Sequence, residues 1–275
     1  TNGRYNIVTV RELLYDKKLF IFDMDGTIYL GEQPFSFAVS FINKLRLSGR
    51  RVLFFTNNAL HPSPYYFKKL ERLGFSPCKD EILTSGDVTA EFLLRHRAGK
   101  TVYLVGTDEL YDDWAAKGVK LSRNGEGADI VVTSFDTSLT YEKLSVACKL
   151  VRGGAEYLST HPDFNCPTED GFIPDSGAIA AFVTASTGVV PRYFGKPYPE
   201  TVDMIKEVTG AKTHEICIFG DRLYTDIATG RRAGITSVLV LTGETKISDV
   251  EAAKEDNRPD LIIPSLADAD EALFA

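Results

Sequence analysis

Two aspartates, Asp23 and Asp25, stand directly after a short apolar run, Leu19–Phe22. A continuous apolar run of this length is typical of a strand that is buried on both faces of a parallel sheet. The two carboxylates and Gly26 then follow the carboxyl end of that strand, where open α/β sheets bind their ligands. Two carboxylates at a buried strand end are costly unless a positive charge joins them. We therefore expect a divalent cation with oxygen ligands there, Mg²⁺ above all.

A second buried strand is expected at 51–55, and one hydroxyl and two carboxamides follow it, on Thr56, Asn57 and Asn58. Taken alone, these residue types are more typical of a turn or a helix N-cap. Because the acidic pair lies one βαβ unit upstream, we favour a second interpretation. The three side chains would then hydrogen-bond a ligand at the same edge of the sheet as Asp23.

A third apolar strand is expected at 216–219, and two further carboxylates follow it, Asp221 and Asp226. Lys196 stands upstream in a loop that prolines flank. A single lysine is usually a surface charge. The position of Lys196 is different, because its loop lies shortly before the helix that leads into the third strand.

These motifs resemble, in their order along the chain, those of the haloacid dehalogenase (HAD) superfamily of phosphohydrolases. DMDGT at 23–27 resembles motif I, and Thr56 matches motif II at the end of the second strand. GKPYP around Lys196 resembles motif III, and GDRLYTDI from Gly220 resembles motif IV. The string TNN at 56–58 looks like the NagD-type or p-nitrophenylphosphatase branch. Four matches in this order are far more specific than any one motif.

The resemblance implies a phosphatase that forms an aspartyl-phosphate. Asp23 is then the nucleophile, and it needs no activating base because a carboxylate is ionised at neutral pH. Asp25 is the general acid for the leaving alkoxide and then the general base for water. Lys196 neutralises charge on Asp23 and on the phosphoryl group. An acidic residue at position 25 is expected of a phosphatase or a phosphomutase.

Mg²⁺ is the cofactor that the resemblance implies, with Asp23, the backbone carbonyl of Asp25 and Asp221 as ligands. Asp226 is expected to orient Lys196 or a metal-bound water, and a helix cap is its alternative.

The expected substrate-binding residues share polar side chains that can meet a phosphoryl oxygen or the rest of the substrate. They are Thr56, Asn57, Asn58, Lys196 and His161. The role of His161 is open between substrate contact and the capping of a turn. Relatives often have TNPD at this segment, so His161 replaces an asparagine, and Asp175 stands where glycine is common.

The remaining pattern predicts an α/β fold, with a HAD-type Rossmannoid parallel-sheet core and an inserted α/β cap domain. The short stretch between Thr27 and Thr56 leaves no room for a helical cap, so the insertion follows motif II. We expect the discontinuous catalytic core at 1–84 and 191–275 and the cap at 85–190. A glycine hinge is expected at Gly86, and an irregular loop at 161–177.

The composition, with 44% hydrophobic and 25% charged residues, is that of an ordinary globular protein. The 275 residues carry a formal net charge of −7, which argues against nucleic acid as a partner. The sequence contains no run of eighteen apolar residues, so we expect no membrane partner. Its N-terminus lacks the apolar core of a signal peptide. The four cysteines are scattered, as expected of reduced thiols in a cytoplasmic protein.

Two alternative functions remain, a phosphometabolite sensor without catalysis and a phosphotransferase. The substrate is open among sugar phosphates, nucleotides, phosphoglycolate and p-nitrophenyl phosphate. Cap-to-cap homodimers occur in relatives, so a homodimer through the cap is a further partner that the resemblance allows.

Overall fold

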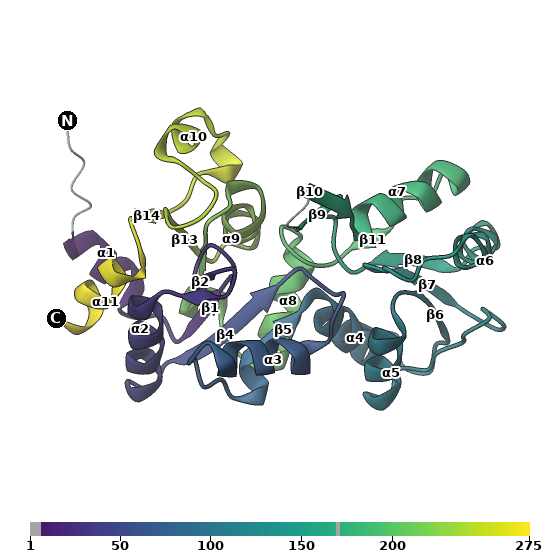
Figure 1. Ribbon diagram of the computed structural model, residues 1–275, viewed down its shortest axis with the longest axis horizontal. Helices are drawn as coiled ribbons and strands as arrows, with labels where there is room; N and C mark the ends of the chain where they lie inside the picture. The colour runs from purple at the N-terminus through teal and green to yellow at the C-terminus, as the bar shows by residue number, and fades with distance from the viewer. Residues whose placement is uncertain (1–6, 169–170) are drawn as a thin grey trace. The chain divides into compact units, whose positions relative to one another are not determined.

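The computed structural model describes residues 7–168 and 171–275, shown in Figure 1. Contacts between residues divide the chain into two compact units. Unit 1 contains the chain up to Phe55, then Tyr66–Leu83 and Lys196–Ala275, and unit 2 contains Thr56–Tyr65 and Thr84–Gly195. The short segment 56–65 thus groups with the inserted residues. The boundaries that we expected for a catalytic core and a cap stay a prediction.

Six strands form the sheet of unit 1, in the order β14-β13-β12-β1-β4-β5. In chain order they are β1 (Leu19–Phe22), β4 (Arg51–Thr56), β5 (Ile82–Thr84), β12 (Ile216–Gly220), β13 (Thr236–Val240) and β14 (Leu261–Ile263). β1 pairs in parallel with β12 on one side and with β4 on the other. The chain builds first one side of β1 and later the other, so the strand order reverses there. Such a reversal is where open α/β sheets place a ligand site.

Helices cover this sheet because their apolar side chains recur at helical spacing. The α-helices that lie wholly or mainly in unit 1 are α1 (Ile7–Leu14), α2 (Ser36–Leu47), α3 (Ser63–Arg72), α8 (Pro199–Thr209), α9 (Ala228–Ala233), α10 (Ile247–Ala252) and α11 (Leu266–Phe274). Helix α2 buries Phe41, whose ring meets the edge of Phe22 at 6.2 Å between centroids. Phe22 in turn stacks on Phe219, so aromatic rings fix β1 against β12.

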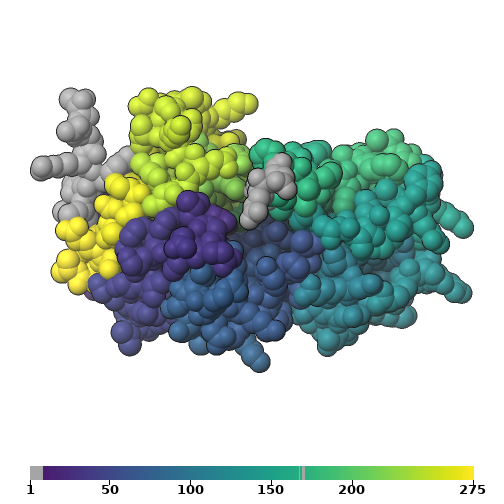
Figure 2. Space-filling model, in the orientation of Figure 1, coloured from purple at the N-terminus to yellow at the C-terminus, as the bar shows by residue number. Residues whose placement is uncertain are grey.

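The shorter elements of unit 1 are a small hairpin and several helical turns. They are β2 (Tyr29–Leu30), β3 (Gln33–Pro34), η1 (Lys79–Glu81), η2 (Thr213–Glu215), η3 (Leu223–Ile227) and η4 (Glu255–Asn257). The C-terminal helix α11 packs against both α1 and α2, and Figure 2 shows its yellow residues beside the indigo residues of α2. The first and the last helix of unit 1 therefore pack directly against each other.

Unit 2 has its own parallel sheet, in the order β11-β8-β7-β6. Its strands are β6 (Val102–Val105), β7 (Ile130–Thr133), β8 (Glu156–Ser159) and β11 (Arg192–Tyr193), and its helices are α4 (Ser85–His96), α5 (Asp108–Ala116), α6 (Tyr141–Arg152) and α7 (Ser176–Thr187). Buried side chains of β6, β7 and β8 pack with α6 and α7. The two parallel sheets confirm the predicted α/β class with a parallel-sheet core.

Two local expectations were wrong. The region 161–177 contains a hairpin, β9 (Asn165–Thr168) with β10 (Gly171–Pro174), whose tip at 169–170 lies outside the described residues. Gly86 is no hinge, because α4 already begins at Ser85. A capping box drives that early start: Thr84 Oγ1 accepts a hydrogen bond from Asp87 N, and Asp87 Oδ2 accepts one from Thr84 N.

Over the described ranges 7–168 and 171–275, we find no helix with the length and apolar character that a membrane crossing requires.

Candidate active site

Asp23 continues the line of β1, and its backbone N–H donates to Phe219 O on β12 at 2.9 Å. The chain then turns back, with Ile28 N donating to Met24 O at 2.9 Å. Asp25 lies on this turn and is exposed, and its Oδ1 accepts a long bond of 3.5 Å from Gly31 N. The turn therefore separates the two carboxylates. Asp23 lies half-buried at the carboxyl end of β1, and Asp25 is exposed to solvent.

Two glycines make room for Asp221. Gly26 has φ +81°, and a Cβ there would lie 2.5 Å from Asp221 Oδ2. A Cβ on Gly243 would lie well under 3.0 Å from the same oxygen, closer than real Cβ contacts allow. Glu244 N donates to Asp221 Oδ2 at 2.7 Å. The Asp221 carboxylate is thus packed between two backbone segments and held by a main-chain donor.

Lys196 joins two of the carboxylates in unit 1. Its Nζ contacts Asp23 Oδ1 and lies 2.7 Å from Asp226 Oδ1. Burial by itself would lower the pKa of Lys196, but Asp226 and Asp23 raise that pKa above its usual value. The amine therefore stays a cation and is shared between the two carboxylates.

Asp226 is fully buried and comes from η3, just after β12. Its Oδ2 accepts a hydrogen bond from Arg222 N at 3.2 Å. Gly220 has to be a glycine, since a Cβ there would overlap the Asp226 carboxylate. Burial raises the pKa of Asp226 to about 6, although Lys196 acts in the opposite direction. The contact with Lys196 matches the orienting role that we predicted, and the role itself remains a prediction.

Three carboxylates, those of Asp23, Asp221 and Asp226, offer oxygens that all lie within 4.8 Å of one another. Burial, followed by Asp226 and Asp23, raises the pKa of Asp221 to about 7. Asp221 Oδ1 is buried and accepts no hydrogen bond from the residues that the structure describes. An orphaned buried acceptor among several carboxylates fits a bound divalent cation, because buried acceptors are otherwise satisfied. The Asp25 carboxylate lies outside this group, and its expected backbone contact with the metal stays a prediction.

The polar residues at the end of β4 and just after it form a local turn in unit 2. Thr56 Oγ1 accepts from Asn58 N at 3.2 Å, and Asn58 Oδ1 accepts from Leu60 N at 2.9 Å. Asn57 is buried, and its Nδ2 donates to Asp163 Oδ2 at 3.0 Å. The turn that we gave as an alternative is present. Binding of a substrate by this segment stays a prediction.

His161 is fully buried in unit 2, and both of its ring nitrogens have partners there. Nε2 lies 2.8 Å from Asp175 Oδ1, and Nδ1 lies 3.2 Å from Ser85 Oγ and 3.0 Å from Thr160 Oγ1. Burial alone would lower the pKa of His161, but Asp175 raises it above the usual value. Ligand atoms of His161, Asp163 and Asp175 also lie within 4.8 Å of one another. Because these contacts already use the ring nitrogens, we assign no metal there, and direct substrate contact by His161 stays a prediction.

Sequence reasoning missed two contributors to the acidic cluster, Gly243 and Arg222. In the sequence, Gly243 indicated only the end of a strand. The structure places it directly against the Asp221 carboxylate. Arg222 forms an ion pair with Glu244 at 3.0 Å. Burial would lower the pKa of Arg222, and Asp23 leads the charges that raise it. The GDR string contained this residue, but its charge was not used.

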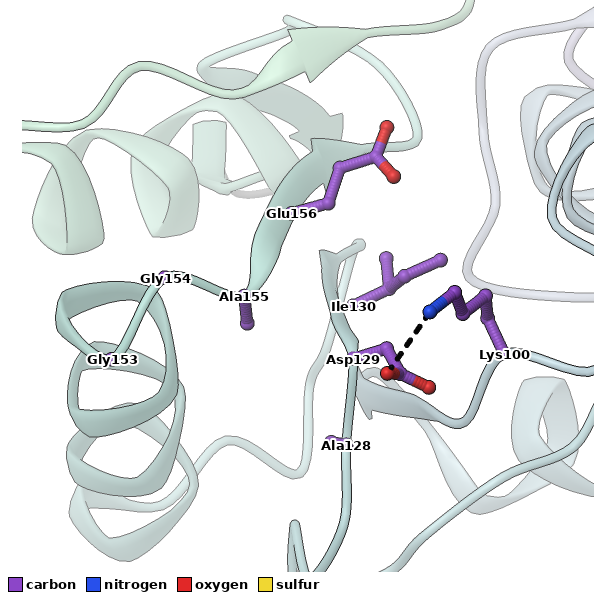
Figure 3. A pocket seen from close by; sticks show the side chains of 8 residues that line it. All are labelled: Lys100, Ala128, Asp129, Ile130, Gly153, Gly154, Ala155 and Glu156. Atoms are coloured by element: carbon purple, nitrogen blue, oxygen red, sulfur yellow. Dashed lines mark hydrogen bonds and ion pairs between the residues drawn. The ribbon is translucent and has the colours of Figure 1, made fainter.

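A hollow of about 420 Å³ lies elsewhere in unit 2, at the amino ends of β7 and β8 (Figure 3). Lys100 points into it and pairs with Asp129 at 3.3 Å. None of the predicted site residues lines this hollow. It also lies at the opposite end of the strands from Thr160 and His161, which follow β8.

The chain is similar in sequence to known hydrolases. A family model described as haloacid dehalogenase-like hydrolase matches residues 20–120, and a second HAD-hydrolase-like model matches 193–269. An acid sugar phosphatase of Staphylococcus aureus is 35% identical over 85% of this chain and 90% of its own length. The matched regions contain all four motifs.

Solved structures give the same result. A 4-nitrophenylphosphatase from Thermotoga maritima is 41% identical, covers 95% of this chain and 99% of its own, and superposes with a TM-score of 0.88. A glycerol phosphate phosphatase from Mycobacterium tuberculosis, solved in complex with calcium, is 31% identical over 94% of this chain and 76% of its own, with a TM-score of 0.85. The same enzyme was also solved with magnesium, and a further relative is named for nagD. The chain therefore belongs to the haloacid dehalogenase-like hydrolases and is a phosphatase of the NagD type.

Proposed function

We propose that this phosphatase hydrolyses small phosphomonoesters with Mg²⁺, through an aspartyl-phosphate on Asp23. One observation carries the proposal: the Lys196 amine joins Asp23 to Asp226 beside an Asp221 oxygen that has no partner. The proposed nucleophile, a fixed cation and an oxygen that could bind a metal thus lie together at the carboxyl ends of β1 and β12. A doubly negative phosphomonoester needs positioning and charge neutralisation of this kind.

In the first step, an Asp23 oxygen forms a bond to phosphorus while the bond from phosphorus to the leaving oxygen breaks. Lys196 stabilises the negative charge that gathers between the nucleophile and the phosphoryl oxygens. Because Lys196 is buried and held by Asp226, this charge is already in place before the substrate binds. The positive charge of Lys196 therefore does not have to be reoriented during the reaction.

Asp25 is the general acid of this step and gives its proton to the leaving alkoxide. In the second step, Asp25 takes a proton from the water that attacks phosphorus. The bond between phosphorus and the Asp23 oxygen then breaks, which releases phosphate and restores the carboxylate. The exposed position of Asp25 on the turn suits a group that must meet both a leaving group and water.

Asp23 and Asp221, with the backbone carbonyl of Asp25, are the residues that would hold Mg²⁺. Bound there, the ion offsets the repulsion between the Asp23 carboxylate and the phosphoryl group. The unpartnered oxygen of Asp221 and the relative solved with magnesium support this choice.

Thr56, Asn57 and Asn58 are proposed to hydrogen-bond the phosphoryl oxygens, because β4 ends beside β1 at the edge that carries Asp23. The proposed substrates are sugar phosphates, glycerol phosphate and p-nitrophenyl phosphate, as the names of the relatives indicate, with nucleotides and phosphoglycolate also in range. Residues 85–190 are proposed as the cap that selects among them, and a homodimer through this cap remains part of the proposal. The four free cysteines favour a cytoplasmic location.

The test is phosphate release from these compounds by the full chain, with Mg²⁺ and with EDTA, beside an Asp23→Asn control. We expect turnover with Mg²⁺, its loss with EDTA, and a fall of roughly a thousandfold or more in Asp23→Asn. Release of phosphate by the Asp23→Asn variant at the wild-type rate would remove the nucleophile assignment. No release from any compound would favour a sensor, and transfer to an added alcohol would favour a phosphotransferase.

A further inference from the structure

The partners of His161 fix which of its ring nitrogens carry hydrogen. Nε2 lies 2.8 Å from Asp175 Oδ1, and the same oxygen accepts a bond of 2.5 Å from Ser176 N. An oxygen that already accepts a main-chain N–H in this way acts as a carboxylate acceptor. The ring therefore has to donate, and Nε2 carries a hydrogen.

The second ring nitrogen faces a hydroxyl that has already used its hydrogen. Ser85 Oγ lies 2.5 Å from Asn57 O, and a carbonyl oxygen can only accept. Ser85 therefore donates to Asn57, and its oxygen accepts from His161 Nδ1 at 3.2 Å. Thr160 Oγ1, 3.0 Å from Nδ1, likewise gives its hydrogen to Ser134 Oγ. Nδ1 carries a hydrogen as well.

We propose that His161 is a buried imidazolium whose Nδ1–H fixes the main chain of Asn57 through Ser85. Asp175 supplies the counter-charge, and Asp163 is the other charged group that acts on the ring. His161 and Asp175 are then positioning residues for the segment 56–58, and the inference rests on the proposed function of that segment. Asp175 and Asp163 raise the pKa of His161 against the effect of burial, as this arrangement requires.

Close packing shows that this linkage leaves little room for Asn57 to move. A Cβ on Gly195 would lie 2.8 Å from His161 Cβ, 2.9 Å from Asn57 Oδ1 and 3.0 Å from Thr160 O. The chain that leaves unit 2 therefore passes directly against the histidine and the asparagine. Asn57 is also held from its side-chain amide by Asp163, so its main chain and its side chain each have a fixed partner.

The structure joins His161 and Asp175 in one buried pair, with Nε2 2.8 Å from Asp175 Oδ1. The two residues therefore form a single feature of unit 2, and a change of either one should remove the function of the other.

The protonation state can be measured on the wild-type protein by ¹⁵N NMR of the histidine side chains, at neutral pH. We expect both His161 nitrogens to report an imidazolium at pH 7. A neutral His161 ring at pH 7 would overturn the proposal. This readout does not depend on phosphatase activity, so it separates failure of this inference from failure of the proposed function.

The positioning role is tested by the variants His161→Gln, Asp175→Asn and their double combination, with His214→Gln as the matched control. Each single change should raise KM for p-nitrophenyl phosphate and the inhibition constant of inorganic phosphate about tenfold, because a buried hydrogen bond is lost. The change in kcat should be smaller. In Asp175→Asn, lower pH should restore KM, because it protonates the histidine again.

Because the pair acts as a unit, the double variant should be no worse than the poorer single variant. Folded single variants with wild-type KM, or singles whose effects add in the double, would contradict the proposal. The NMR measurement on the wild type decides the question if a variant does not fold.

Discussion

Lys196 Nζ lies 2.7 Å from Asp226 Oδ1, and both side chains are buried. The second contact of the same amine is with Asp23. Asp226 therefore does more than fill the space beside Gly220: it holds the Lys196 cation where this cation contacts Asp23, the proposed nucleophile. A buried cation with two carboxylate partners is costly to disturb, because removal of one partner leaves the charge uncompensated.

Asp226→Asn should lower both stability and activity. We expect the free energy of unfolding to fall by about 3 kcal/mol, as for other buried pairs that lose one member. The value of kcat should fall by at least tenfold, because Lys196 is no longer oriented. Urea unfolding and steady-state kinetics with p-nitrophenyl phosphate measure the two effects.

The control for that variant is Asp270→Asn, which removes the ion pair between Asp270 and the partly exposed Lys44. Surface pairs contribute little, so this change should cost less than about 1 kcal/mol and leave kcat unchanged. Equal losses in the two variants would refute a special role for Asp226.

Gly243→Ala should weaken the binding of Mg²⁺ more than it lowers the free energy of unfolding. The new Cβ would overlap Oδ2 of Asp221 and shift the whole carboxylate, including Oδ1, the oxygen that would face the metal. We expect the Mg²⁺ concentration for half-maximal activity to rise by roughly tenfold or more, the scale seen when supports of metal ligands are lost. Gly153→Ala is the control, because Gly153 has an ordinary helical φ and a Cβ there would lie no closer than 3.3 Å to any neighbour. An unchanged Mg²⁺ requirement in Gly243→Ala would remove Asp221 from the metal site.

Asp25→Asn should affect substrates according to their leaving groups. A sugar or glycerol alkoxide needs a proton as it leaves, so kcat for such substrates should fall by roughly a hundredfold or more. The p-nitrophenolate group leaves readily without a proton, so its ester should lose much less. Burst kinetics with both substrate types measure the difference. A uniform loss would assign Asp25 to metal binding in place of proton transfer.

The stability of the metal-free protein should depend on Asp221 in a defined direction. The folded-state pKa is about 7, above the value of about 3.9 for an unfolded aspartate. Between these values the folded state binds more protons than the unfolded chain, so the contribution of Asp221 to stability falls as pH rises. Below about pH 4 both states are protonated and the contribution is constant.

We therefore expect Asp221→Asn to gain stability relative to the wild type as pH is raised from 5 to 8 in EDTA. Urea unfolding of both proteins across this range measures the difference, and unrelated titrations cancel between them. Added Mg²⁺ should stabilise the wild type more at pH 8 than at pH 5.5, because the metal competes with protons. A stability difference independent of pH would mean that Asp221 is ionised throughout.

The sequence was sufficient to predict the strands and helices that carry the motifs. Leu19–Phe22 and Ile216–Gly220 are continuous apolar runs, and such runs next to acidic motifs leave few alternatives for a buried parallel strand. The meeting of Asp23 with Lys196 followed from the resemblance, because no local signal links residues so far apart in the chain.

Some elements and contacts could not be predicted from the sequence. The hairpin β9–β10 was expected as a loop, since its turn-rich sequence lacks the alternation of a strand, although the two strands are neighbours in the chain. The short helix α10 was also missed, because six residues give too little periodicity. The pairing of His161 with Asp175 depends on where β8 ends and α7 begins, which neither residue reveals by itself.

The order of strands in unit 1 has a consequence for synthesis of the protein. β1, which ends directly before Asp23, is translated before unit 2, and its neighbour β12 follows only after all of unit 2. Unit 2 is complete when Gly195 has left the ribosome, whereas β1 still lacks one of its two partners at that time. A nascent chain would therefore carry a finished inserted unit together with an apolar strand, β1, whose edge stays open until β12 has been made.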